Sequence, residues 1–436
     1  MFSGIESMRA LTSSHFPVAI VGGGQAGLSI SYCLKQRGID HIIFEKNQIA
    51  HSWRSKRWDS FCLVTPNWQC MLPGYPYSGH DPDGFMQRDE IVQYIEDYAK
   101  SFKPLIKEGV TVSKISKPEN VFEIETSIGH YIADQVVVAT GGYHTPKIPR
   151  MSERLPSSIT QLHSSEYKNP ESLPEGAVLV VGTGQSGCQI AEDLHLAGRQ
   201  VHLCVGGAPR APRRYRNKDV VDWLDQMGYY DLAIDDHPQK ASVRVKTNHY
   251  VTGRDGGREI DLRRFALEGM RLHGKLNHID GAQLEFNDDL KHNLDQADAV
   301  AESIKQTIDS YIEKNHLDAP LDPPYQAVWQ PETSLLSLDL AAANISAVIW
   351  STGYHTDFSW IDIPVFDGKG YPGHERGVTA NQGLYFLGLP WLYTWGSGRF
   401  SGIARDANYL ADCIALQNRV LPRQLSRNVN QVALGS

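Results

Sequence analysis

The pattern Gly-x-Gly-x-x-Gly occurs twice in this chain of 436 residues, with the two copies about 160 residues apart. An apolar run too short for a helix precedes each copy, at residues 17–21 and 177–181, and a helix-like apolar stretch follows it. The glycines are Gly22, Gly24 and Gly27 in the first copy and Gly182, Gly184 and Gly187 in the second. Between a strand and a helix, such glycines permit a tight turn, backbone approach to a pyrophosphate, and close helix packing. The sequence therefore predicts an α/β fold with two dinucleotide-binding, Rossmann-like domains.

The two copies differ in the residue that ends their second strand. Glu45 follows the apolar residues 41–44 and lies 23 residues after Gly22, where an acid can accept hydrogen bonds from ribose hydroxyls. Val205 has the same offset from Gly182. Three arginines follow it, namely Arg210, Arg213 and Arg214. Because guanidinium groups bind phosphate bidentately, we predict FAD in the first domain and NADPH in the second, with a solvated basic loop as the alternative for the arginines. The other predicted cofactor contacts in the two glycine loops are Gln25, Ala26, Gln185 and Ser186.

Apolar strands outside the glycine loops indicate how the domains are connected. Residues 135–139 and 347–351 form two such runs, and each is stopped by glycine. We interpret the later run, together with residues 383–388, as a return to the first domain. The predicted FAD domain is therefore discontinuous, with residues 1–150 and 345–436. The predicted NADPH domain, residues 151–344, is inserted into it and carries a helical elaboration at residues 286–317.

Charge and composition exclude several classes of function. The net charge of -8, from 42 Lys+Arg against 50 Asp+Glu, creates no field that would attract nucleic acid. No apolar run reaches the roughly 18 residues that a membrane span needs, and residues 1–16 lack the apolar core of a signal peptide. The six cysteines include no Cys-x-x-Cys pair, which favours a reducing cytoplasm, and no metal site is predicted. We expect a cytoplasmic enzyme that acts on small molecules, and leave a homodimer open.

Disulfide reduction is one reaction that two nucleotide sites could support. It would need two cysteines able to react with the flavin and with each other. We interpret Cys62 and Cys70 as buried small residues, although the sequence alone leaves such a pair open.

Two further motifs resemble those of single-component flavoprotein monooxygenases, the class that includes flavin-containing N- and S-monooxygenases and Baeyer–Villiger enzymes. The Gly-Gly-x-Trp flavin motif of that family falls on residues 50–53, where Trp53 and the following Arg54 match and both glycines are replaced. The fingerprint F-x-G-x-x-x-H-x-x-x-W/Y falls on residues 157–167, where His163 and Tyr167 match. The stretches 51–77, 205–219, 251–262 and 384–406 are most similar to a bacterial branch described as flavoproteins of potassium transport. No residue supports the potassium description.

The resemblance implies roles for particular residues. Trp53 and Arg54 would contact FAD, and His163 would couple nicotinamide binding to domain movement, with a histidine that satisfies a loop as the alternative. Asn67 lies close to the position where flavin-containing monooxygenases carry an asparagine beside the flavin, so it is a catalytic candidate. An Asx turn after Pro66 is the alternative interpretation of Asn67.

A glycine-rich and aromatic stretch begins at Gly388 and leads into a helix start that can face the flavin, so Gly388 is included among the cofactor contacts. Its aromatic residues could wall a substrate pocket or form a packed cluster. These residues are Trp391, Tyr393 and Trp395.

The reaction that the resemblance implies belongs mostly to the cofactors. NADPH would reduce FAD, the reduced flavin would react with O2 to a C4a-hydroperoxyflavin, and one oxygen atom would pass to a small substrate. Lys168 follows Tyr167 where Baeyer–Villiger members usually continue with Pro or Asp, which favours nitrogen or sulfur as the oxidised atom. Two alternatives stay open: an NADPH oxidase or dehydrogenase that oxygenates nothing, and a regulatory flavoprotein that senses nucleotides.

Overall fold

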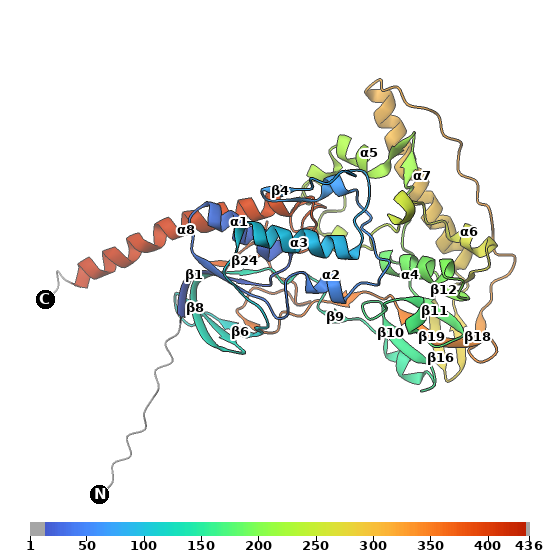
Figure 1. The fold of residues 1–436 in the computed structure, drawn as a ribbon, viewed down its shortest axis with the longest axis horizontal. Coiled ribbons are helices and arrows are strands. Elements are labelled where there is room, and N and C mark those ends of the chain that lie inside the picture. The colour runs from blue at the N-terminus through green and yellow to red at the C-terminus, as the bar shows by residue number, and fades with distance from the viewer. Residues whose placement is uncertain (1–13, 433–436) are drawn as a thin grey trace, which may run out of the picture.

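The computed structural model describes residues 14–432, with side-chain surroundings through residue 419. Two sheets with parallel strands at their centres lie toward opposite ends of an elongated molecule (Figure 1). Both glycine loops lie in strand–turn–helix units, so the predicted α/β fold with two Rossmann-like domains is confirmed. The predicted leader at residues 1–16 falls mostly outside the described residues, and its last three residues belong to the first strand.

The first sheet contains the first glycine loop. Its strands run in the order β21-β6-β7-β8-β1-β2-β5, and β24 also pairs with β8. The bounds are β1 Ser14–Val21, β2 His41–Phe44, β5 Ile106–Lys107, β6 Val112–Ser116, β7 Phe122–Thr126, β8 Gly129–Val138, β21 Ile361–Asp362 and β24 Leu384–Phe386. Strands β1, β2, β8 and β24 are mutually parallel where they pair, and β6, β7 and β8 form an antiparallel meander.

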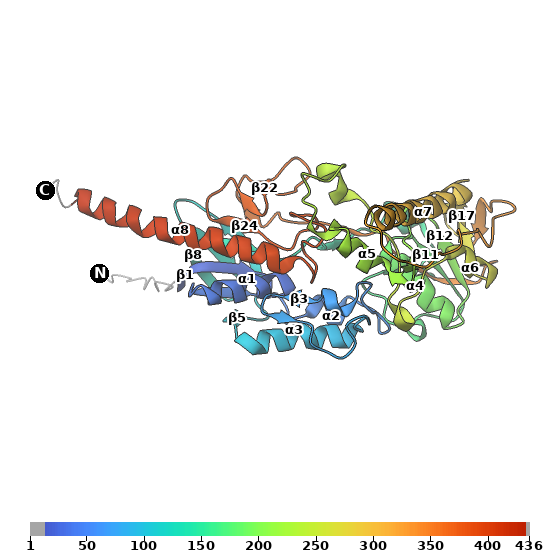
Figure 2. The ribbon, with the colours of Figure 1, turned by 90° about the horizontal axis from the view of Figure 1, so that it is seen from above.

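Three helices pack on one face of this sheet, namely α1 (Gln25–Gln36), α3 (Arg88–Phe102) and α8 (Ile403–Val432). Helices α1 and α8 lie side by side, and α8 continues beyond the body of the protein toward the C-terminus (Figures 1 and 2). Their contact is apolar, because Leu28 and Ile30 of α1 and Leu410 and Ile414 of α8 are all fully buried in one core cluster.

The second sheet contains the second glycine loop. Its five parallel strands have the order β10-β19-β11-β12-β15. Their bounds are β10 Thr160–His163, β11 Ala177–Val181, β12 Val201–Cys204, β15 Arg271–His273 and β19 Ile345–Trp350. Helices α4 (Gln185–Leu196) and α7 (Leu290–Lys314) share a core with one face. A small antiparallel sheet covers the other face, with β16 Leu276–Asp280, β17 Gln283–Phe286 and β18 Ser337–Asp339.

The remaining elements are short, and two of them, β22 and β23, extend the first sheet from β24. The helices among them are α2 His51–Ser55, α5 Val220–Gln226 and α6 Leu262–Leu267. The strands are β3 Met71–Leu72, β4 Tyr75–Pro76, β9 Thr145–Pro146, β13 Arg214–Tyr215, β14 Lys218–Asp219, β20 Tyr354–His355, β22 His374–Glu375 and β23 Val378–Thr379.

The predicted boundary at residue 345 is wrong for one strand. Strand β19 lies between β10 and β11 in the second sheet, and it does not return to the first. A buried apolar run ended by glycine fits the centre of either parallel sheet, so its pattern could not assign it. The return crossing follows Trp350, where β20 pairs with β9 of the outgoing crossing. The predicted return at residues 383–388 is confirmed, because β24 pairs with β8.

A search of the described helices finds none with the length and apolar character to cross a membrane.

Two stacked histidines, His202 on β12 and His273 on β15, are buried in the second sheet. Nδ1 of His202 and Nε2 of His273 are 2.9 Å apart, and the rings are nearly parallel. Burial lowers the pKa of His202 to about 4 and, together with the neighbouring His202, lowers that of His273 to about 3. Both rings are therefore neutral in the folded protein near neutral pH.

This pair predicts a loss of stability in mild acid. The unfolded chain protonates these rings below about pH 6.5 and the folded chain resists until about pH 4, so the free energy of unfolding falls across that window. The loss should be on the order of 3 kcal/mol for each ring at about pH 4. Urea unfolding at several pH values measures it, and the double variant His202→Leu/His273→Leu should lose less. An equal acid loss in that variant would contradict the assignment.

Candidate functional site

The structure gives a steric reason for two of the three glycines in the first loop. Gly22 has a φ of +106°, and a Cβ there would lie 2.7 Å from the carbonyl oxygen of Ala139. A Cβ on Gly27 would lie 1.8 Å from the carbonyl oxygen of Gly22. A Cβ on Gly24, by contrast, would meet no atom within 4 Å. The fold therefore needs Gly22 and Gly27, while Gly24 faces open space at the start of α1.

The second glycine loop repeats this arrangement. Gly182 has a φ of +105°, and a Cβ on Gly187 would lie 1.9 Å from the Gly182 carbonyl oxygen. A Cβ on Gly184 would make only an ordinary contact, 3.6 Å from Cγ2 of Thr247. Neither α1 nor α4 has a side-chain N-cap or an acid in its first turn. Both helix starts can thus present N–H groups to an anion, as a pyrophosphate site requires.

Glu45 lies directly after β2, beside the first loop, as predicted. The backbone N–H of Gly23 donates to one carboxylate oxygen at 2.6 Å, and that of Asn47 donates to the other at 2.8 Å. A Cβ on Gly23 would lie 3.0 Å from the Glu45 Cβ. The carboxylate is therefore fixed at the edge of the loop, next to the open space at Gly24.

In the second domain, a different hydrogen bond joins the end of β12 to the glycine loop. The strand end carries Val205 and Gly206, and the N–H of Gly206 donates to Oγ1 of Thr183 in the glycine loop at 2.9 Å. The second site therefore has the neutral hydroxyl of Thr183 at this contact, whereas the first site has the carboxylate of Glu45. Thr183 is not among the residues predicted from the sequence, although its contrast with Gly23 at the second position of the loop is visible there.

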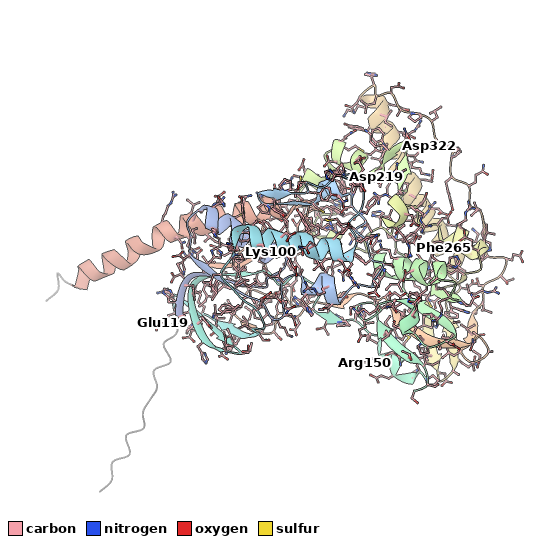
Figure 3. All side chains as sticks on the ribbon, in the orientation of Figure 1. Lys100, Glu119, Arg150, Asp219, Phe265 and Asp322 are labelled. Atoms are coloured by element: carbon pink, nitrogen blue, oxygen red, sulfur yellow. The ribbon has the colours of Figure 1, made fainter. Side chains whose placement is uncertain are left out.

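The arginines after β12 are not all available to a ligand. Arg210 is 1% exposed and pairs with Glu259 and with Asp298, which lies 2.8 Å away. Arg213 is 2% exposed and pairs with Asp219, the N-cap of α5 labelled in Figure 3. Both guanidiniums are thus already paired with acids, which disfavours the prediction that these two arginines hold the 2′-phosphate. The sequence could not reveal this pairing, because the carboxylate partners of Arg210 are 49 and 88 residues away.

Arg214 is the exposed member of the three and forms no ion pair within the part of the chain that the structure describes. We expect Arg214→Ala to weaken NADPH binding about tenfold and to leave NADH binding and stability nearly unchanged. Arg210→Ala should instead lower the free energy of unfolding by about 3 kcal/mol, because it leaves the carboxylates of Glu259 and Asp298 without this partner. Titration with both coenzymes and urea unfolding separate the two effects. If Arg214→Ala binds NADPH as tightly as the wild type does, the last of the three predicted arginines is excluded as a ligand of the 2′-phosphate.

Trp53 and Arg54 follow each other on α2 but point to different neighbours. Nε1 of Trp53 donates to Oε1 of Gln25 at 3.1 Å, and Nε2 of Gln25 donates to the carbonyl of Gly398 at 3.2 Å. Trp53 and Gln25 therefore join the first glycine loop to the segment before α8. Arg54 pairs with Glu96 on α3, and its contact with FAD stays a prediction.

Gly388 lies against the first glycine loop, and packing explains the glycine. It has a φ of +85°, and a Cβ there would lie 2.8 Å from the Cβ of Ala26. The aromatic residues after it favour the packed cluster. Trp391 is buried with Ile234 and Val243, and Trp395 packs partly buried against the same cluster, with the guanidinium of Arg399 over its ring.

Asn67 has a structural place rather than a catalytic one. Its side-chain amide donates to the carbonyl of Asp81 at 2.9 Å, and its side-chain oxygen accepts from the N–H of Met86 at 2.7 Å. Asn67 is 4% exposed, so both ends of its side chain hold the loop between those residues. These contacts favour the turn-forming alternative for Asn67, and its catalytic role stays a prediction.

His163 ends β10 and is fully buried. Its Nε2 lies 3.0 Å from the carbonyl oxygen of Gly353, and its Nδ1 lies 2.9 Å from Oγ of Ser165. Burial lowers the pKa of the ring. With both nitrogens held by protein groups, His163 connects the second sheet to the return crossing, and the structure does not support direct contact with a substrate.

The six cysteines are all free thiols, and five of them are buried. Burial raises the pKa of Cys62 to about 11 and that of Cys70 to about 12. Thiol–disulfide exchange needs an accessible thiolate. Cys62 and Cys70 therefore behave as small buried residues, in agreement with their interpretation from the sequence.

Comparison with known families and relatives adds to this geometry. A family model described as pyridine nucleotide-disulphide oxidoreductase matches residues 19–298. An oxidoreductase of Geobacillus kaustophilus, named as uncharacterized and CzcO-like, is 34% identical over 401 residues, which cover 91% of this chain and 97% of the relative. The probable indole-3-pyruvate monooxygenase YUCCA10 of Arabidopsis thaliana is 32% identical over 327 residues, covering 68% of this chain and 83% of the relative. These names do not support the potassium description.

Two solved structures illustrate the fold similarity. A flavin-containing monooxygenase from Stenotrophomonas maltophilia has a TM-score of 0.62 at 18% identity, over 93% of this chain and 99% of that chain. A bacillithiol disulfide reductase from Bacillus cereus has a TM-score of 0.59 at 16% identity, over 93% and 100%. At these identities the similarity establishes a common fold, which serves both oxygenation and disulfide reduction.

Proposed function

We propose that the chain, which belongs to the pyridine nucleotide-disulphide oxidoreductase family, transfers one oxygen atom from O2 to a small organic substrate. It is an NADPH-dependent flavoprotein oxidoreductase related to flavin monooxygenases, and FAD and NADPH are its cofactors, as predicted from the sequence. The oxygen-transfer reaction consumes one NADPH, one proton and one O2, and it yields NADP⁺, water and the oxygenated substrate.

The residues at both loops fit the two cofactors. The open space at Gly24 and the fixed carboxylate of Glu45 suit the pyrophosphate and ribose of FAD, with Gln25, Ala26, Trp53 and Gly388 around the loop. The open space at Gly184 and the neutral end of β12 suit NADPH. Bound FAD would take a hydride from NADPH and pass the electrons to O2.

One observation favours oxygenation over disulfide reduction within this family. Five of the six cysteines are buried, and burial raises the pKa values of Cys62 and Cys70 far above neutrality, so these two thiols do not form a reactive pair that could accept electrons from the flavin. Oxygen is then the acceptor that needs no reactive group from the protein. The free thiols also support our proposal of a cytoplasmic location.

The chain's own part in this reaction is to hold its two domains together. Asp193 on α4 of the second domain accepts a hydrogen bond from Tyr167 at 2.6 Å and pairs with Arg254 at 2.8 Å. The same carboxylate accepts a hydrogen bond from Ser60 of the first domain. The backbone N–H of Asp59 donates to the carbonyl of Lys168 at 2.8 Å. These contacts would fix the distance between the two nucleotides and limit entry of water, with His163 as a positioning residue.

We propose nitrogen or sulfur as the oxidised atom of the substrate. The support is the family fingerprint, in which Lys168 follows Tyr167 where Baeyer–Villiger members continue differently. The similarity to a named monooxygenase, YUCCA10, supports oxygenation in general.

The test is a panel of small amines, sulfides and ketones added to the holoprotein with NADPH. A substrate should raise NADPH consumption and lower the peroxide formed per NADPH. Peroxide equal to the NADPH consumed with every compound would favour an oxidase. Failure of NADPH to reduce the bound flavin at all would favour a regulatory flavoprotein.

A further inference from the structure

Two arginines at the junction of the domains have no carboxylate partner among the described residues. Arg57 follows α2, and Arg399 precedes α8. Most arginines around them are paired with acids. Arg54, three residues from Arg57, pairs with Glu96, and Arg405, six residues from Arg399, pairs with Asp231 across the domains. A half-buried guanidinium without an acid is costly unless an anion joins it.

The guanidinium of each arginine lies over an aromatic ring. Trp53 and Phe400 are stacked with ring centroids 5.6 Å apart. The guanidinium of Arg57 lies 5.2 Å from the ring centroid of Trp53. Arg399 is the neighbour of Phe400 in sequence, and its guanidinium lies 4.0 Å from the ring centroid of Trp395. Because Trp53 also bonds to Gln25 of the first glycine loop, both arginines lie close to the predicted flavin site.

Arg399 also reaches the second domain. One of its nitrogens donates to Oδ1 of Asn248 at 3.1 Å. The residue before it, Thr247, is the one that approaches Gly184 of the second glycine loop. Arg399 therefore stands between the two nucleotide sites.

Tyrosines, and no acids in the described part of the chain, oppose the effect of burial on the pKa of both guanidiniums. Burial lowers the pKa of Arg57, and Tyr354 and Tyr143 oppose that effect. Burial likewise lowers the pKa of Arg399, and Tyr143, together with Tyr230 and Tyr229, opposes it. Tyr143 is thus within electrostatic reach of both arginines. It lies after β8 on the outgoing crossing, and its ring is 5.4 Å from that of Tyr354 on the return crossing.

We propose that Arg57 and Arg399 form an anion-binding site between the two domains, which takes a carboxylate or phosphate group of a bound ligand. Two unpaired guanidiniums supply planar donors for such a group, and the tyrosines supply further hydroxyl donors and apolar walls. The anion is either the carboxylate of the substrate or a phosphate of NADPH. The site does not depend on oxygen transfer, so it can be tested apart from the proposed function.

The experiment measures binding to the oxidised holoprotein without any reductant, through the change in the flavin absorbance spectrum. The probes are NADP⁺, 3-phenylpropanoate and its neutral analogue 3-phenylpropanamide. We expect Arg57→Gln and Arg399→Gln to weaken the binding of one of the two anions by roughly ten- to a hundredfold. Binding of the amide should weaken by less than about twofold. Arg405→Gln is the matched control, because that arginine already has an acid partner, and it should bind all three probes normally.

The probe whose binding weakens identifies the ligand that supplies the anionic group. Weaker 3-phenylpropanoate binding assigns the site to a substrate carboxylate, and weaker NADP⁺ binding assigns it to a phosphate of the coenzyme. Arg57→Lys and Arg399→Lys keep the positive charge, so they should bind the anion more tightly than the Gln variants do. If a Gln variant fails to fold, the corresponding Lys variant still tests the proposal. Wild-type affinity for both anions in the flavin-loaded Gln variants would overturn the proposal, as would Lys variants that bind no anion although they retain flavin.

Discussion

Gly24→Val should yield a folded protein that has lost its flavin. A Cβ at this position meets no atom within 4 Å, and the backbone φ of -77° suits any residue, so the apoprotein has no reason to unfold. The valine would instead fill the space that the pyrophosphate needs, and FAD occupancy should fall at least tenfold. The ratio of flavin to protein absorbance after purification measures the loss, and far-UV circular dichroism verifies the fold.

Gly184→Val is the matched control in the second loop. Its backbone φ of -62° and the single ordinary contact to Thr247 also permit a side chain in the apoprotein. This variant should keep its flavin and lose affinity for NADPH, so the two changes should give opposite phenotypes. Full flavin occupancy in Gly24→Val would contradict the assignment of FAD to the first loop.

Gly27→Ala should have the largest effect on stability. Its Cβ would lie 1.8 Å from the Gly22 carbonyl oxygen, and because this oxygen belongs to the backbone, α1 must move away from β1. We expect a loss of roughly 3 kcal/mol or more in the free energy of unfolding, together with weaker flavin binding. Urea unfolding of the apoprotein measures the stability term alone. Gly24→Ala, which adds the same methyl group to open space, should be near neutral in that assay, and an equal loss in both variants would contradict the steric argument.

Local patterns explain what could be predicted from the sequence. The glycine loops and Glu45 depend on residues that lie within about 25 positions of one another, and the geometry of a βαβ unit fixes their roles. The structure accordingly places Gly22, Gly27 and Glu45 as expected. The cofactor contacts themselves stay predictions.

Long-range partners explain what could not be predicted. Strand β19 joined the second sheet because its apolar pattern fits either one, and the acids that bind Arg210 come from distant segments. The same limitation hid Arg57 and Arg399, since the absence of a carboxylate partner is a property of the folded chain alone. The structural role of Asn67 could not be predicted for a related reason, because its side chain binds a loop that begins 14 residues later.

The most direct test of the proposed function uses ¹⁸O2. The holoprotein is supplied with NADPH and with whichever amine or sulfide raises NADPH consumption, under an atmosphere of labelled oxygen, and the product is analysed by mass spectrometry. A monooxygenase places one labelled atom in each product molecule and the other in water. We expect a product shifted by one labelled oxygen, with little peroxide. Unlabelled or unchanged substrate, together with labelled peroxide equal to the NADPH consumed, would contradict oxygen transfer.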